Sequence, residues 1–179
     1  MIIGFSGYAR AGKDTCADII CRTHRNYCKI SFAEELKSEC NAMMATVGRD
    51  INFYFEDDKI RHRDFLVFWG KYCREHFGTG YWVAQLERSM DSLRRCNGTE
   101  SFVVSDVRYP NEVEWIRANG GVVIYVRRPG TGAANDEEER TIGEILSRGL
   151  YDYGIDNDGT IDTLRRRLDH LFRMGYVTE

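Results

Sequence analysis

The chain has 179 residues, of which 42% are hydrophobic and 30% are charged, and its formal net charge is −3. This length and composition predict one soluble globular domain with a sizeable core. The negative balance argues against a nucleic-acid coat and against a binder of anionic membranes, because either needs a basic surface. No apolar run approaches the ~20 residues of a membrane span. We therefore expect neither a nucleic acid nor a membrane among the partners.

The six cysteines form no C-x-x-C pair, and Cys73 lies near a histidine, His76, at a spacing that resembles a zinc site. The first residues are typical of a strand and do not resemble a signal peptide. We expect reduced thiols that pack as small hydrophobes, in a cytoplasmic protein.

The first predicted elements enclose a glycine-containing loop. Residues 1–6 form an apolar run typical of a buried strand, residues 7–15 read GYARAGKDT, and residues 16–22 have the pattern of a helix. Strand, glycine loop, lysine and helix in this order are typical of a phosphate-binding loop. Its glycines permit a sharp turn and a close approach of a phosphate to backbone amides at the positive end of a helix dipole. A glycine-rich turn with a solvated lysine is the alternative, and we favour phosphate binding.

Two residues of this loop need separate comment. Lys13 opposes the helix dipole unless a phosphate is bound, which supports the phosphate-loop interpretation. The hydroxyl residue that normally follows the lysine is replaced by Asp14, and Thr15 cannot simply substitute because it lies about 100° further around the helix. A carboxylate is a good magnesium ligand, but an acid in a first helical turn is also favourable without a metal. Both interpretations of Asp14 stay open.

The next part of the chain predicts mainly helices. We expect a strand at 28–32, a helix at 33–47, a mixed segment at 48–60, a helix at 61–76 and a helix from 81 to about 96. Three aromatic residues of the mixed segment belong either to the core or beside a bound base, and we favour the core: Phe53, Tyr54 and Phe55. Four apolar residues recur at helical spacing in the segment 61–76: Phe65, Phe68, Trp69 and Tyr72. The basic residues between them fit either a solvated face or contacts to a substrate phosphate.

Strands return in the last part of the chain. We expect strands at 102–104, 122–126 and 153–155, helices from Pro110 and from about residue 160, and a mobile flap at 129–148. Thr160 or Asp158 is the expected cap of the last helix. Its apolar face is expected to contain Ile161, Leu164, Leu168, Leu171 and Phe172. The arginines 165–167 are expected on its solvated face.

Alternating strands and helices predict a parallel sheet with helices on both faces. Ligands of such sheets bind beyond the carboxyl ends of the strands. This rule places groups from separate parts of the chain at one edge: the loop 7–15, Asp106 with Arg108, Arg127 with Arg128, and Asn157.

These motifs together resemble the phage-type deoxynucleoside monophosphate kinases. The matching segments cover most of the chain: 7–15, 32–37, 63–70, 81–83, 105–112, 120–124, 128–130 and 156–160. The most specific of them is SDVRYPNE at 105–112. The resemblance implies a single α/β domain, residues 1–179, with the P-loop kinase fold. It further implies a five-stranded parallel sheet with helices on both faces, a helical acceptor-binding region at about 48–98 and a short lid at about 129–148.

The resemblance also implies a reaction: transfer of the ATP γ-phosphoryl group to a deoxynucleoside 5′-monophosphate, with Mg²⁺. It places the reacting phosphates beside Lys13, Asp106, Arg108 and Arg128. The ATP phosphates would be held by Gly7, Arg10, Ala11, Gly12, Lys13, Asp14 and Thr15. Magnesium would be held by Asp14 and Asp106, the adenine would lie near Asn157, the acceptor would contact Arg63, Arg74 and Trp82, and the lid would carry Arg140. For Asp106, an ion pair or a helix cap is the competing interpretation.

Two departures from the family pattern limit this transfer of roles. Val67 stands where a glutamine is frequent, so base recognition differs. An acidic run stands where the flap often has a histidine and a serine-glutamate pair, so no role is assigned to residues 136–139.

Other functions compete with this interpretation. A small-metabolite kinase such as phosphomevalonate kinase, or a nucleotide-binding regulatory module without activity, is an alternative. The aromatic-rich stretch 53–82 favours a nucleotide acceptor. The partners implied are ATP and a deoxynucleoside monophosphate, with a possible homodimer by analogy, and the location would be the host cytoplasm if a phage encodes the chain.

Overall fold

The computed structural model describes residues 1–177 and divides into two compact units. Met1–Ser31 and Met90–Glu179 form the first, which we call the sheet unit, and Phe32–Ser89 form the second, the helical unit. The helical unit therefore begins earlier and ends earlier than the expected region at 48–98. Its role in acceptor binding stays a prediction.

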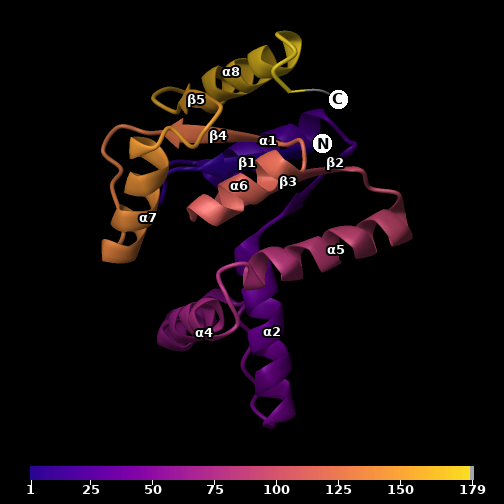
Figure 1. Ribbon diagram of the computed structural model, residues 1–179, viewed down its shortest axis with the longest axis vertical. Helices are drawn as coiled ribbons and strands as arrows, with labels where there is room; N and C mark the ends of the chain where they lie inside the picture. Colours follow the sequence, from indigo (N-terminus) through magenta and orange to yellow (C-terminus); the bar gives the residue numbers. More distant parts are fainter. Residues whose placement is uncertain (178–179) are drawn as a thin grey trace. The chain divides into compact units, whose positions relative to one another are not determined.

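The sheet unit contains a five-stranded parallel sheet, as the sequence predicts (Figure 1). The strands are β1 (Ile2–Ser6), β2 (Tyr27–Ile30), β3 (Ser101–Val107), β4 (Val122–Arg127) and β5 (Tyr153–Asp156). Their order is β2-β3-β1-β4-β5, and every pairing is parallel. β2 and β3 thus lie on one side of the central strand β1, and β4 and β5 lie on the other side. The loop after β1 lies at the point where the strand order reverses, which is where open α/β sheets bind ligands.

Both faces of β1 are covered, which explains its unbroken apolar run. All five of its residues are buried. Ile3 and Phe5 belong to the core cluster that also contains residues of α1 (Lys13–Thr23) and α8 (Ile161–Arg173). On the opposite face, a Cβ added at Gly4 would lie 2.5 Å from Ile116 Cδ1 in α6 (Pro110–Ala118). Helices therefore flank both faces of the sheet.

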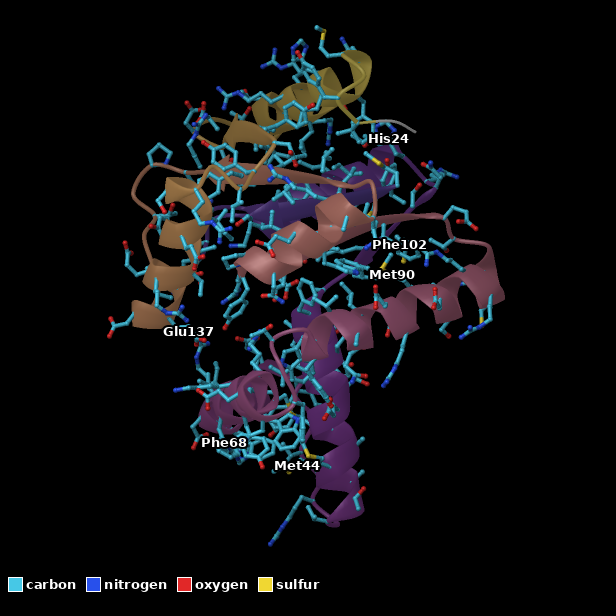
Figure 2. The ribbon with its side chains drawn as sticks, viewed as in Figure 1. His24, Met44, Phe68, Met90, Phe102 and Glu137 are labelled. Carbon is cyan, nitrogen blue, oxygen red and sulfur yellow. The ribbon has the colours of Figure 1, made fainter. Side chains whose placement is uncertain are left out.

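Aromatic contacts extend this packing at two places in Figure 2. The ring of His24, at the end of α1, stacks on Phe172 of α8 with 3.9 Å between centroids. Met90 and Phe102, from α5 (Tyr81–Asn97) and β3, are both buried. Phe102 also lies under the guanidinium of Arg94, 5.4 Å from the ring centroid.

The last helix differs in one position from the expected apolar face. Leu164, Leu168 and Leu171 of the expected apolar face are buried, but Ile161 of the same face is 62% exposed. Ile161 is the first residue of α8, and Thr160 caps the helix by accepting from the Thr163 amide. Because Ile161 is the first residue of α8, it lies outside the part of the helix that packs on the sheet.

The strand β3 is longer than the sequence suggested. It runs to Val107, so Ser105 and Asp106 belong to the strand and do not follow it. The pairing with β1 is irregular between Gly4 and Ser6. Such an irregularity changes the local direction of side chains next to the site.

More than half of the segment expected to be a flap is a packed helix, α7 (Asp136–Ser147). Asn135 caps it by accepting from the Glu138 amide. Thr141, Ile142 and Ile145 are buried. Motion of the segment stays a prediction.

The helical unit contains α2 (Phe32–Thr46), α3 (Glu56–Arg61), α4 (Arg63–His76) and the first half of α5. Its core cluster is formed by Cys40, Phe53 and Leu66. Phe53 confirms the expected core position, but its neighbours Tyr54 and Phe55 are 52% and 65% exposed, so their assignment to the core is wrong. The helix α3 was not expected from the sequence.

The buried face of α4 is rotated from the expected stripe. Its buried residues are Leu66, Gly70 and Cys73, and Phe68, labelled in Figure 2, is 57% exposed. Phe65 and Trp69 of the expected stripe are half-buried and pack against the core cluster of this unit. The sequence pattern therefore found part of the packed face but missed the small residues Gly70 and Cys73.

Glu39 of α2 joins the other helices of this unit. Its Oε1 accepts from Trp69 Nε1 at 3.1 Å and from the Tyr81 hydroxyl at 2.9 Å. Burial and this carboxylate raise the pKa of Tyr81 to about 12. One acidic side chain thereby ties α2 to both α4 and α5.

Two expectations about the whole chain can be compared with the structure. All six cysteines are free, in agreement with the expected thiols. Within residues 1–177, no helix combines the length and apolarity that a membrane crossing needs.

Candidate functional site

The loop between β1 and α1 is shaped by its two glycines. Gly7 has φ +142°, and a Cβ there would lie 2.5 Å from the Val126 carbonyl oxygen. Gly12 has φ +103°, and a Cβ there would lie 2.4 Å from Asn157 Nδ2. Only glycine combines these backbone angles with such close neighbours. The backbone of the loop is consequently fixed before any ligand binds.

Lys13 lies under this loop and is only 7% exposed. Its Nζ donates to the carbonyl oxygens of Gly7 at 2.6 Å and Tyr8 at 2.8 Å. Burial, followed by the nearby Arg108 guanidinium, lowers the pKa of Lys13 to about 8. An ammonium has three donors, so one N–H remains for an anion at the loop.

Asn157 fastens the loop from the end of β5. Its Nδ2 donates to the Ala11 carbonyl oxygen at 2.8 Å, and its own amide donates to Arg127 O at 2.7 Å. Arg127 in turn pairs with Asp156, with Nε and Oδ1 2.7 Å apart. The adenine-side role expected for Asn157 is untested, and its visible role is to support the loop.

The turn after β3 is held by a buried acid that the sequence reading did not single out. Glu112, only 2% exposed, accepts through Oε2 from the amides of Arg108 at 2.8 Å and Tyr109 at 3.1 Å. Glu112 is the third residue of α6, so this is one half of a capping box. The spacing of Tyr109, Pro110 and Glu112 was a signal available in the sequence. It fixes the backbone from which the Arg108 side chain projects.

Asp14 and Asp106 are the carboxylates expected to hold magnesium. Asp14 is exposed and pairs with Lys29, with 3.0 Å between Oδ1 and Nζ. Although burial acts to raise it, the hydrogen bond and charge of Lys29 hold the pKa of Asp14 below its usual value. Asp106 is partly exposed near the end of β3, and its charge acts on Lys13. No group of three or more His, Cys, Asp or Glu suited to a metal occurs within residues 1–177.

This donor set fits magnesium bound together with a nucleotide. Such an ion takes one or two carboxylates and obtains its remaining ligands from phosphates and water. A preformed cage of protein ligands is therefore not required, and two carboxylates near the loop suffice.

Glu138 is the residue of the site that the sequence analysis set aside with the acidic run 136–139. Its side chain is 2% exposed, and its Oε1 lies 3.9 Å from Arg108 Nη1. Its neighbour Glu137, labelled in Figure 2, accepts from the Tyr109 hydroxyl at 2.7 Å. The spacing Asn135 to Glu138 is that of a capped helix start, which the sequence could have revealed. It could not have revealed the burial of the carboxylate.

The structure brings part of the predicted site together. The loop, Lys13, Arg108 and Asn157 are linked by the contacts above, and the charge of Asp106 reaches Lys13. Other expected members are not linked to the loop by the contacts described. Arg128 and Arg140 are exposed residues of the sheet unit, and Arg63, Arg74 and Trp82 belong to the helical unit.

A hollow of about 390 Å³ is lined by α1 and α8, and along α1 it extends from Thr15 to Thr23. The exposed Ile161 and Arg165 line it from α8. Asp18 and Arg22 line it from α1, so apolar, acidic and basic side chains all face this space, which reaches the loop at Thr15.

The fold resembles that of small kinases of known structure. Shikimate kinase from Aquifex aeolicus gives a TM-score of 0.52 at 12% identity, with 100% of both chains covered. Dephospho-CoA kinase from Campylobacter jejuni gives a TM-score of 0.52 at 16% identity, with 98% of both covered. At these identities the likeness concerns the fold alone, which is that of P-loop kinases.

Sequence comparison leads to a family. The protein named "Putative deoxynucleotide monophosphate kinase" of Acanthamoeba polyphaga mimivirus is 25% identical over 178 residues, covering 90% of this chain and 91% of that protein. The "Deoxynucleotide monophosphate kinase" of Enterobacteria phage T4 is 31% identical over 144 residues, covering 80% of this chain but only 58% of the phage protein. The family model for deoxynucleotide monophosphate kinase matches residues 67–168, which is more than half of the chain. The chain belongs to the deoxynucleotide monophosphate kinase family.

Proposed function

We propose that the protein transfers the γ-phosphoryl group of ATP to a deoxynucleoside 5′-monophosphate, which yields the diphosphate and ADP. The observation that carries this proposal is the buried Lys13 beneath a glycine-shaped loop, with Arg108 beside it, in a chain of this family. Family membership also supports a nucleotide acceptor over a small metabolite, and an enzyme over a regulatory module.

The ATP phosphates would bind at the loop. The amides of residues 7–15 and the free N–H of Lys13 supply donors at the start of α1, where the helix dipole also favours an anion. Binding of a phosphate relieves the cost of burying the lysine ammonium, since the cation gains an opposite charge. A buried lysine at this position is therefore explained by a bound phosphate better than by packing alone.

The adenine of ATP would occupy the hollow beside Thr15. Ile161, 62% exposed at the start of α8, provides an apolar surface in this hollow, and Arg165 lies on the same lining. Asn157 lies beside the proposed phosphate site, because its side chain donates to the Ala11 carbonyl oxygen of the loop.

Magnesium would be held by Asp14 and Asp106, directly or through water, and when bound it would neutralise phosphate charge. Asp14 would have to exchange its pairing with Lys29 for the ion or a water bound to it.

The acceptor would contact the helical unit. Arg63 is exposed in the first turn of α4, and the Arg74 side chain donates to Gly70 O at 3.0 Å. Trp82 is 2% exposed and its Nε1 donates to the same carbonyl at 3.0 Å. The arginines are therefore better suited than the indole to contact a phosphate. Arg128 and Arg140 are proposed to reach the phosphates from the sheet unit.

The reaction needs no strong base, because the acceptor oxygen already belongs to a phosphate dianion. Catalysis of a loose phosphoryl transfer is positioning and neutralisation of charge on the moving group. Lys13 and Arg108 supply fixed positive charge, and the forked guanidinium of Arg108 matches phosphate oxygens.

The test is a product assay with ATP and magnesium against a panel of acceptors. The panel contains each deoxynucleoside monophosphate, each ribonucleoside monophosphate and mevalonate phosphate. We expect diphosphate from at least one deoxynucleotide, and we expect a chelator of divalent ions to abolish it. Phosphorylation of mevalonate phosphate alone, or of no acceptor, would contradict the proposal.

A further inference from the structure

A buried carboxylate oxygen at the start of α7 lacks a hydrogen bond. Glu138 Oε2 accepts from the Ala134 amide at 2.7 Å, but Oε1 has no hydrogen-bond partner. Within residues 1–177, the only other buried side-chain oxygen or nitrogen in this condition is Ser6 Oγ, immediately before the phosphate loop. An unpaired buried acceptor is costly, so its presence calls for a functional explanation.

The position of this carboxylate is set by the packing of its helix. The Asn135 side chain accepts from the Glu138 amide at 2.9 Å, which fixes the first turn. One turn further, Ile142 and Ile145 are fully buried and anchor α7. Glu138 therefore cannot leave its place without disrupting packed side chains.

The unpaired oxygen faces Arg108. The distance of 3.9 Å between Oε1 and Arg108 Nη1 is an ion-pair distance but is too long for a hydrogen bond. The Arg108 side chain is 48% exposed, so a large part of it is open to a ligand. Its backbone amide is already fixed by Glu112. Only the side chain of Arg108 still has freedom, and Glu138 is the acid beside it.

We propose that Glu138 is a positioning residue for Arg108: its Oε1 fixes one side of the guanidinium so that the remaining N–H groups face the reacting phosphates. The inference rests on the proposed function. A guanidinium has five N–H donors in a rigid fork, so a partner on one edge determines where the others point. A long and flexible side chain thereby loses its freedom before the substrate binds.

The charges around the loop support this role. Arg108 and Lys13 are both cations, and each disfavours the other at close range. The negative charge of Glu138 acts on Lys13 in the opposite sense, as do those of Asp106 and Asp14. A buried carboxylate next to Arg108 thus offsets repulsion between the two cations while no nucleotide is bound.

The test is a set of variants assayed with ATP and an accepted deoxynucleotide. Glu138→Gln keeps an amide oxygen for the Ala134 amide but removes the charge. We expect kcat to fall about 10- to 100-fold, as for the loss of part of one transition-state contact, with the KM for ATP and the melting temperature little changed. The matched control is Glu144→Gln, on the same helix, where the acid pairs with Arg148 at 2.7 Å. It should leave kcat unchanged.

A double-mutant cycle separates positioning from a structural role. Arg108→Ala alone should lower kcat by about 10³-fold, in the range known for arginines that contact transferring phosphates. If Glu138 acts through Arg108, adding Glu138→Gln to Arg108→Ala causes no further loss. Should the glutamine variant fail to fold, Glu138→Asp keeps the charge on a shorter side chain and should still lower kcat.

The outcomes are distinct. Wild-type kcat in Glu138→Gln, wild-type kcat in Glu138→Asp if that variant has to be used, or independent losses that multiply in the double variant, would overturn the inference and leave the proposed function intact. Absence of transfer by the wild-type protein would overturn the proposed function, and the inference with it.

Discussion

The loop end of the sheet unit and the helical unit are stabilised in different ways. At the loop, backbone angles and carbonyl oxygens determine the geometry: Gly7 and Gly12 adopt positive φ, and Lys13 donates to two carbonyls. In the helical unit, side-chain hydrogen bonds determine the geometry: the Glu39 carboxylate accepts from Trp69 and Tyr81. At Gly7 and Gly12 the loop has no room for an added methyl group. The helical unit has a smaller core cluster than the sheet unit.

This difference fits the two roles that we propose, in which the loop binds phosphates and the helical unit contacts a base. A phosphate is the same in every nucleotide, so a rigid backbone site is suited to it. The helical unit leaves Phe55 65% exposed and Val67 53% exposed, and such apolar surface suits contact with a variable partner such as a base. Each of the following predictions changes one side of this comparison.

The largest effect is expected from Gly12→Ala. The new Cβ would meet Asn157 Nδ2 at 2.4 Å and would impose a backbone angle that alanine disfavours. We expect ATP affinity to fall on the order of 100-fold, since strain and the displaced Asn157 together cost a few kcal/mol. Isothermal titration with ATP measures this.

Gly98→Ala is the control for the loop variant. Gly98 has φ +66° but nothing within 4 Å of an added Cβ, so it carries the strain without the contact. It should lower the melting temperature slightly and leave ATP affinity unchanged. Equal losses of ATP affinity in both variants would show that the close approach to Asn157 is unimportant.

A smaller effect, confined to stability, is expected from Tyr81→Phe. Loss of the hydrogen bond to the Glu39 carboxylate should lower the free energy of unfolding by about 1.5–3 kcal/mol. Trp69 and Trp82 lie in the helical unit and their fluorescence in urea follows it, although Trp115 contributes a signal from the sheet unit. The control is Tyr176→Phe, at a 42% exposed residue, which should have no effect. A change in ATP affinity in Tyr81→Phe would argue against the separation of the two regions.

The same contact predicts a pH dependence. Burial and Glu39 raise the pKa of Tyr81 from 10.0 to about 12, so the folded state favours the neutral phenol. The stabilisation is complete below pH 10 and is lost as the pH rises toward 12. The difference in unfolding free energy between wild type and Tyr81→Phe should therefore shrink over this range. A constant difference would contradict the assignment.

The smallest effect concerns thiol labelling, which leaves the fold intact. Cys96 is exposed and should react first. Burial raises the pKa of Cys40 and Cys16 to about 12 each, so both should react only through local opening. We expect Cys40, in the smaller core of the helical unit, to react before Cys16, on the helix after the loop. Mass spectrometry at timed intervals checks the order, and labelling of Cys16 ahead of Cys40 would reverse the comparison.

The sequence predicted the sheet and its edge well, because alternation of strands and helices and the glycine loop are local signals. All five strands and the cap at Thr160 agree with the structure. The side chains of the helical unit were predicted less well: Phe68 and Phe55 are exposed, whereas Gly70 and Cys73 form a buried face. Helices pack through small residues that allow close contact as well as through large apolar ones. The spacing of apolar residues in the sequence indicates only the large ones.

Within the site, the sequence revealed residues that carry a motif and missed those that support them. Lys13 and Arg108 follow from the loop and from the strand end. Glu112 and Glu138 are buried acids whose partners lie in the turn after β3. Glu112 acts at the start of its own helix, and its capping-box spacing was a local signal. The role of Glu138 depends on how α7 packs beside that turn, and such a tertiary contact leaves no local signature in an acidic run.

The most direct test of the central claim follows the fate of a radiolabel on the γ-phosphate of ATP. Wild type and Lys13→Ala are incubated with magnesium and the four deoxynucleoside monophosphates. The account predicts that label appears in a deoxynucleoside diphosphate in equal amount to the ADP formed, and that Lys13→Ala loses at least about 10²-fold in rate. Label that stays in ATP, that appears only in inorganic phosphate, or that is transferred equally well by Lys13→Ala would contradict it.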